Sequence, residues 1–84
     1  METLKYIIDS HNNFQIFSHT TIHSVAARSM QSYPIAAGFI TINITLGSET
    51  IINCFGESVT LKLKSRGQED ANIIFNKLFL DCNT

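Results

Sequence analysis

The sequence feature that most constrains the fold is the run "ITINITL" at residues 40–46, where isoleucine and leucine alternate strictly with threonine and asparagine. Successive side chains of a β-strand point to opposite faces, so this period of two predicts a strand with one apolar and one polar face. Such strands are typical of an antiparallel sheet that is covered on one face. We extend the strand to residues 35–46, and we expect the small residues "AAG" before the alternation to mark a bulge or a close approach of another backbone.

Patterns on both sides of this strand indicate four more strands and two helices. Apolar runs before and after "SHNN" predict a first hairpin, and "TIINCF" and "SVTLKL" predict two strands that follow the central one through turns at "GSE" and Gly56. The order is ββαβββα, so we expect an α+β fold with an antiparallel five-stranded sheet and two helices, in a single domain of residues 1–84. The five strands are predicted at residues 4–9, 14–17, 35–46, 50–55 and 58–63.

The first predicted helix lies in "SHTTIHSVAARSM", with Ser18 or Thr20 as its N-cap and a length of about three turns. Within it, His19 and His23 are four residues apart and share one edge of the helix if it begins early enough. This spacing suits a metal ion, a ligand contact, an interface or a local capping network. No third metal ligand is evident, although His11, Asp9 or Cys54 could supply one. We therefore assign no metal and no cofactor and keep both histidines as candidates that orient a ligand.

The second predicted helix has a clear start. Ser65 followed three residues later by Gln68 fits the capping box, in which the two side chains satisfy free backbone N–H groups of the first turn. Glu69 and Asp70 then place negative charge where the helix dipole favours it. The apolar side chains that follow as far as Cys82 form a face wider than one sheet needs to cover. The candidate interface residues on this face are Ile73, Phe79 and Leu80.

Composition limits the classes of function. Only 15% of the 84 residues are charged, against about 25% in an average domain, so much of the surface is neutral or apolar and a homo-oligomer is expected. A net charge of -1 with six Lys and Arg residues gives no basis for broad nucleic-acid binding. The N-terminus lacks the pattern of a signal peptide, and no apolar run is long enough for a membrane span. We therefore expect a cytoplasmic protein in which Cys54 and Cys82 are reduced thiols.

The stretch "SVTLKLKSR" carries the candidate ligand site. As a strand it would direct Val59, Leu61 and Leu63 to the core and its hydroxyl and lysine side chains to the opposite face. Together with the free N–H groups at the start of the following helix, these side chains would hold a phosphate or carboxylate. The alternative is that the lysines only keep an exposed strand edge soluble. The candidate ligand-binding residues are Ser58, Thr60, Lys62, Lys64, Arg66, His19 and His23.

An enzyme is not expected. Ser58 in "GESV" is similar to the GxSxG nucleophile turn but lacks its second glycine, and strand-like alternation follows it instead of a helix. A catalytic thiol would require an electropositive environment that the sequence around Cys54 does not indicate. We assign no catalytic residue.

Three segments, "HTTIHSVA", "YPIAAGFI" and "FGESVTLKLKSRGQEDANII", resemble a family of small proteins of bacteria and their phages. The family pattern is an HS-x-x-A helix, an AGF strand and a G-x-S-x-S-L-x-x-x-S-R-x-x-D ending. Thr60 stands where the pattern has a serine, and the spacing around Gly67 departs from it. The resemblance implies a bacterial or phage accessory protein and supplies no mechanism. The matching positions are His23, Ser24, Ala26, Ala37, Gly38, Phe39, Gly56, Glu57, Ser58, Leu61, Ser65, Arg66 and Asp70.

Two functions of different classes follow from the sequence. The first is a non-enzymatic, oligomeric binding protein, a phage accessory protein that sequesters an anionic ligand of the nucleotide type. The second is a protein-interaction inhibitor or adaptor that contacts a host protein through the apolar surface of the C-terminal helix. Oligomeric state distinguishes them, since a strict monomer favours the second.

Overall fold

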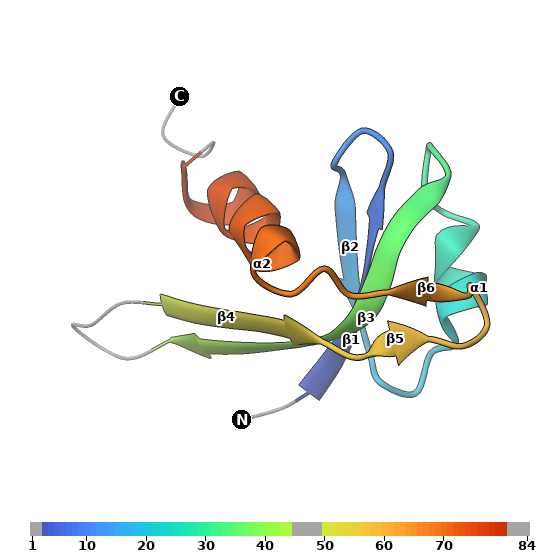
Figure 1. The fold of residues 1–84 in the computed structure, drawn as a ribbon, viewed down its shortest axis with the longest axis horizontal. Coiled ribbons are helices and arrows are strands. Elements are labelled where there is room, and N and C mark those ends of the chain that lie inside the picture. The colour runs from blue at the N-terminus through green and yellow to red at the C-terminus, as the bar shows by residue number, and fades with distance from the viewer. Residues whose placement is uncertain (1–2, 45–49, 81–84) are drawn as a thin grey trace.

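The computed structural model describes residues 3–44 and 50–80 and has the expected α+β fold (Figure 1). A four-stranded antiparallel sheet has the spatial order β2-β1-β3-β4, and a separate two-stranded hairpin pairs β5 with β6. The strands of the sheet are β1 (Thr3–Asp9), β2 (Phe14–Phe17), β3 (Pro34–Ile44) and β4 (Thr50–Phe55). The other elements are helix α1 (His23–Ala27), β5 (Glu57–Ser58), β6 (Leu63–Lys64), helix α2 (Gln68–Phe75) and the π-helical segment η1 (Asn76–Leu80).

The first hairpin forms as predicted, and its turn is built by an aspartate. One carboxylate oxygen of Asp9, Oδ1, accepts hydrogen bonds from the backbone N–H groups of His11 (2.9 Å) and Asn13 (3.0 Å). Asn12 has a positive φ of 61°, a conformation that asparagine tolerates better than most residues. The side chain of Asp9 thus determines where β1 ends and β2 begins.

Strand β3 confirms the central alternation and its polar face. Ile40 is buried, whereas Thr41 is half-buried and Asn43 is exposed. The small residues before the alternation mark a close approach, as expected: a Cβ added to Gly38 would lie 2.5 Å from the backbone oxygen of Phe55. Only glycine allows the chain after β4 to cross β3 at this distance. The predicted "GSE" turn after β3 lies outside the described residues.

The two helices lie on opposite faces of the sheet, with β1 and β3 between them (Figure 1). Tyr6, Ile7 and Ile8 are consecutive in β1 and have no exposed surface, so both faces are covered at this strand. The larger core lies on the α2 face and contains Tyr6, Ile8, Ala36, Ile40, Ile52, Ala71 and Ile74. The smaller core lies on the α1 face and contains Ile7, Ala26 and Ala37, with Leu61 and Leu63 of the hairpin packed against them.

The predicted fifth strand at residues 58–63 is wrong, because turn chemistry interrupts the alternating pattern. The hydroxyl of Ser58 accepts the backbone N–H of Leu61 (3.2 Å), and the N–H of Lys62 bonds to the carbonyl of Val59 (3.3 Å). These bonds fold the segment into a turn between β5 and β6, with Lys62 at a positive φ of 56°. Val59, predicted in the core, is 80% exposed, and Ser58 is buried.

The first helix is shorter than predicted and begins later. Its N-cap is Ile22, which makes no side-chain cap, while Ser18 uses its hydroxyl to accept the N–H of Thr20 in the preceding turn. A serine that satisfies a local backbone N–H favours a turn over a helix, which accounts for the late start. Ile22 and Val25, whose spacing is typical of one face of a helix, are about half exposed.

The second helix begins at the predicted place without the predicted capping box. Its N-cap is Gly67, with φ 64° and no side-chain cap. Asp70 takes the role assigned to Gln68, since its carboxylate accepts the backbone N–H of Arg66 at 2.8 Å. Within residues 3–44 and 50–80, no helix is both long and apolar enough to cross a membrane.

Candidate functional site

A pocket of about 250 Å³ opens between helix α1 and the β5–β6 hairpin. We name it the α1–hairpin pocket. Strand β1, the start of α1, strand β3 and the hairpin each contribute to it, so it exists only once these elements have packed together. Its lining residues are Lys5, Ile22, His23, Phe39, Glu57, Val59 and Thr60.

His23 is the buried polar group of this pocket. Its Nε2 lies 3.0 Å from the carbonyl oxygen of Gly38, and because a carbonyl only accepts, Nε2 carries the proton and Nδ1 remains an acceptor. Burial lowers the pKa of His23, the nearby Lys5 ammonium lowers it further, and the bond to Gly38 opposes both. His23 is therefore a neutral imidazole at pH 7 and contributes a hydrogen-bond acceptor instead of a positive charge.

Aromatic and branched side chains form an apolar wall. The ring of Phe39 is stacked on that of Phe55 with centroids 5.9 Å apart, and His23 meets Phe39 edge-on at 6.1 Å. Ile22 and Val59 flank the opening, and both are more than half exposed. A wall of this kind can contact the flat face of a ring such as a nucleobase.

Charged and hydroxyl groups lie at the edge of the same pocket. The Nζ of Lys5 donates to the backbone oxygen of Thr21 at 2.9 Å, which ties β1 to the segment before α1. Glu57 lies opposite Lys64 in the β5–β6 register. The hydroxyl of Thr60 is 3.4 Å from that of Ser58. An ammonium, a carboxylate and a hydroxyl are thus available to a ligand with both polar and apolar parts.

The structure brings together only two of the candidate ligand-binding residues as pocket lining, His23 and Thr60. Ser58 is buried in the hairpin turn. Lys62 and Lys64 are exposed in that hairpin, one in the turn and one on β6, and not on one face of a single strand. His19 lies in the exposed turn before α1, so it does not share a helix edge with His23.

Arg66 belongs to a network around the buried Asp70 instead of the pocket. Its Nε donates to Oδ1 of Asp70 at 2.6 Å, and its guanidinium also meets Glu69 at 2.7 Å. The hydroxyl of Tyr6 donates to the other oxygen of Asp70 and lies 2.7 Å from the hydroxyl of Ser65. These bonds join β1 to the start of α2, so the predicted anion site at this helix start is already occupied by the side chain of Asp70.

Sequence reasoning missed Lys5 and Phe39 as pocket residues. Lys5 lies in a strand that reads only as core, and Phe39 reads as part of the apolar β3. Glu57 stands in the turn before the predicted ligand strand, where the sequence predicts a ligand contact, and it does line the pocket. Nothing in the local patterns links these three positions, because they are brought together by long-range packing.

Of the three candidate interface side chains, the structure describes that of Ile73. Ile73 is half-buried and packs against the core of the α2 face. The side chains of Phe79 and Leu80 lie outside the described residues, as does Cys82. The interface on this helix stays a prediction.

Within the part of the chain that the structure describes, no three His, Cys, Asp or Glu side chains are grouped to hold a metal ion. Cys54 is a half-buried free thiol. Burial raises its pKa to about 12, and the negative charge of Asp70 acts in the same direction. No model of a protein family, no curated protein and no solved structure matches this chain.

Proposed function

We propose that this chain is a non-enzymatic, homo-oligomeric binding protein of the cytoplasm, a phage accessory protein that sequesters an anionic, nucleotide-type ligand in the α1–hairpin pocket. The observation that carries the proposal is the composition of that pocket, which combines an apolar wall with an ammonium, a hydroxyl and a carboxylate. Ligand pockets are typically apolar with a few convergent polar groups, as this one is.

Each part of a nucleotide has a counterpart in the pocket. The base packs against Ile22, Phe39 and Val59, and its N–H groups face Glu57. The phosphate lies toward the Lys5 ammonium and the Thr60 hydroxyl, which are suitable donors for phosphate oxygens. Lys62 and Lys64 on the hairpin add positive charge that attracts the anion from solution.

Self-association is part of the proposal because large apolar side chains remain exposed around the pocket. Ile22, Phe55 and Val59 are each at least 46% exposed in the single chain. Covering them with a second copy removes apolar surface from water, which is the main favourable contribution to most protein association. Native mass spectrometry tests this, and it also reports any ligand that copurifies.

Calorimetric titration of cyclic di- and trinucleotides tests ligand binding, with two matched valine variants. Val59→Glu adds a carboxylate at the pocket opening and should weaken binding by about tenfold or more, since it repels the phosphate. Val25→Glu makes the same change at a valine that is exposed and does not line the pocket, so it should bind as the wild type does. Absence of heat with the wild type across the panel, or equal loss in both variants, would contradict the proposal.

A second candidate function follows if the wild type is a monomer that binds no nucleotide. The chain would then act as an interaction inhibitor or adaptor through its C-terminal helix. The same native mass spectrum distinguishes these two functions, because sequestration by a homo-oligomer requires a mass above that of one chain.

A further inference from the structure

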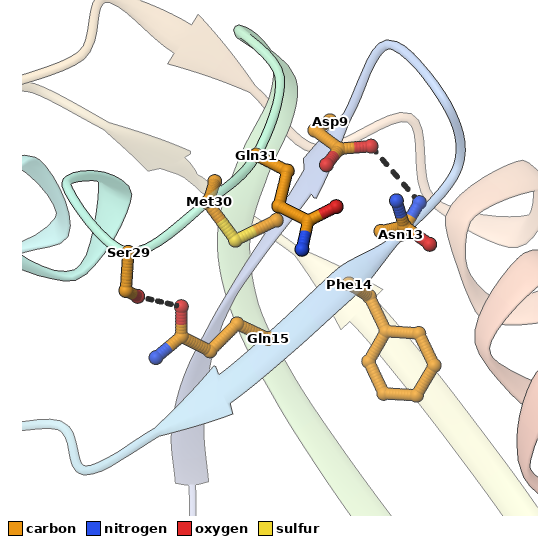
Figure 2. A pocket seen from close by; sticks show the side chains of 7 residues that line it. All are labelled: Asp9, Asn13, Phe14, Gln15, Ser29, Met30 and Gln31. Atoms are coloured by element: carbon orange, nitrogen blue, oxygen red, sulfur yellow. Dashed lines mark hydrogen bonds between the residues drawn. The ribbon is translucent and has the colours of Figure 1, made fainter.

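A second and larger pocket lies at the turn of the β1–β2 hairpin, on the side of the segment between α1 and β3 (Figure 2). We name it the hairpin-turn pocket. Its volume is about 340 Å³. It shares no lining residue with the α1–hairpin pocket. The residues that line it are Asp9, Asn13, Phe14, Gln15, Ser29, Met30 and Gln31.

This pocket contains the one buried side-chain oxygen or nitrogen, among the described residues, that has no hydrogen-bond partner: Oδ2 of Asp9. Asp9 has no exposed surface, and its Oδ1 is occupied by the N–H groups of His11 and Asn13. Large majorities of buried polar atoms in proteins are paired, so an unpaired carboxylate oxygen requires an explanation. A ligand that supplies the missing donor is one.

The other polar groups of the pocket are neutral. The hydroxyl of Ser29 donates to the side-chain oxygen of Gln15 at 2.7 Å, which fixes that amide against the end of α1 (Figure 2). Asn13 and Gln31 contribute further amides, and none of the lining residues is a lysine, an arginine or a histidine. A positive charge that would complement Asp9 is therefore absent from the pocket wall, and none of the amides there donates to Oδ2.

The chemistry of the wall favours an organic cation over a metal ion. Calcium and magnesium sites commonly use several carboxylates, and Asp9 is the single carboxylate here. Met30 contributes apolar and polarizable surface, which suits the carbon chain of a small amine. The site thus matches a cationic head with N–H donors on a short apolar body.

The backbone around the pocket is held in place before any ligand arrives. The N–H of Ser10 bonds to the carbonyl of Tyr33 at 3.0 Å, and a ring nitrogen of His11 bonds to the hydroxyl of Ser32. These two contacts connect the hairpin turn to the segment that leads into β3. Gln31 is exposed, and its side chain extends beside Asp9 and Met30 (Figure 2). A rotamer change of this exposed side chain opens the way to Oδ2, and such changes are fast.

We infer that the hairpin-turn pocket binds a small organic cation, a primary ammonium or an amidinium, whose N–H groups donate to Oδ2 of Asp9. The proposal concerns a different site and a ligand of opposite charge from the α1–hairpin pocket. The ligand would occupy the space beside Met30 and the side-chain amides of Asn13 and Gln31.

The test uses n-butylammonium and benzamidinium as probes, with amide chemical shifts of ¹⁵N-labelled protein as the measurement. We expect both probes to shift the N–H signals of His11 and Asn13, which bond to the same carboxylate. 1-Butanol lacks the charge and tetramethylammonium lacks N–H donors, so both should bind at least about tenfold more weakly. Equal shifts with tetramethylammonium, or no shift with either probe, overturn the inference and leave a water molecule as the partner of Oδ2.

Two variants connect the binding to Asp9. Asp9→Asn keeps an oxygen for the His11 and Asn13 amides and removes only the free acceptor, so the turn should persist and affinity should fall by at least about tenfold. Met30→Lys places an ammonium on the pocket wall and should block both probes while raising the melting temperature. Undiminished binding to either variant contradicts the inference. Met30→Lys leaves the hydrogen bonds of the Asp9 turn in place, so the test does not depend on whether Asp9→Asn folds.

Discussion

Asp70 and Asp9 are both aspartates with no exposed surface, and they lie in two differently built regions. Asp70, at the start of α2, has both carboxylate oxygens occupied: Tyr6 and the Arg66 backbone share one, and the Arg66 guanidinium holds the other. Asp9, at the β1–β2 turn, has one oxygen held by two backbone amides and the other without a partner. Burial alone therefore does not distinguish a structural carboxylate from a binding one, whereas the account of its hydrogen bonds does.

The physical cause of this difference is the set of hydrogen bonds that each carboxylate would lose if its charge were removed. At Asp70, every acceptor position faces a donor, so an uncharged replacement leaves donors unsatisfied in the core. At Asp9, the free oxygen costs stability in the empty protein, and its removal relieves that cost. Function is commonly retained at the expense of stability, and Asp9 has the properties expected of such a site.

The same substitution at the two aspartates gives the largest expected effect. Asp70→Asn should lower the free energy of unfolding by about 3 kcal/mol, because an amide has a single acceptor oxygen, cannot accept from both Tyr6 and the Arg66 side chain, and leaves the guanidinium with the exposed Glu69 as its remaining partner. Asp9→Asn should leave it within about 1 kcal/mol of the wild type or raise it. Urea denaturation followed by circular dichroism measures both. A loss at Asp9 as large as that at Asp70 would show that the two carboxylates have the same role.

Removal of a single donor gives a smaller effect. Tyr6→Phe takes away the hydroxyl that donates to Asp70 and should cost about 1–2 kcal/mol of unfolding free energy. Tyr33→Phe is the matched control, since the side chain of Tyr33 is 72% exposed and its change should stay within about 0.5 kcal/mol. Equal effects at the two tyrosines would argue against the Asp70 network as a source of stability.

His23 provides a pH-dependent contrast with the Asp70 network. Its pKa is lowered by burial from the ordinary value of 6.5, so the unfolded chain takes up this proton before the folded chain does. Above about pH 6.5, the neutral His23 therefore contributes fully to the free energy of unfolding. This contribution is lost as the pH falls toward the lowered pKa. Urea denaturation at several pH values measures the slope. His23→Gln should flatten it, and the exposed His19→Gln should not; the reverse result would assign the slope to another group.

The smallest expected effect is on the reaction rate of the Cys54 thiol, which depends on the charge of Asp70. With a pKa raised to about 12 by burial and by Asp70, only about one thiol in ten thousand is ionised at pH 8. Iodoacetamide should therefore react much more slowly with the native protein than with the urea-unfolded protein, in a Cys82→Ser background. In Asp70→Asn the thiol should react faster. An unchanged rate in that variant would show that burial alone protects the thiol.

Much of the sheet could be predicted because its signals are local. The alternation in β3 and the short apolar runs of β1, β2 and β4 were enough to place these strands within one or two residues of their observed bounds at every described end. The alternation at residues 58–63 was equally regular and misleading. There, the Ser58 hydroxyl bonds to a backbone N–H three residues later, and such a side-chain bond can replace a strand by a turn.

The candidate sites were predicted less well, for the same physical reason. His23 and Thr60 were identified from their residue types, yet Lys5, Phe39 and Glu57 meet them only through packing between distant segments. Asp9 was considered only as a possible third metal ligand beside His19 and His23, and nothing in the sequence marks one of its oxygens as unpaired. An unpaired oxygen is a property of the complete set of neighbours, and a local pattern cannot report it.

The sequence by itself determined the α+β class, the first hairpin, the central strand and the start of the second helix, because periodicity, turn residues and proline act over a few neighbouring residues. Only the tertiary structure decided that the helices cover opposite faces, that Arg66 is bound by Asp70, and that Asp9 retains a free oxygen beside a pocket. These outcomes depend on which groups from distant segments satisfy one another once water is excluded, and that pairing is settled by the packed fold as a whole.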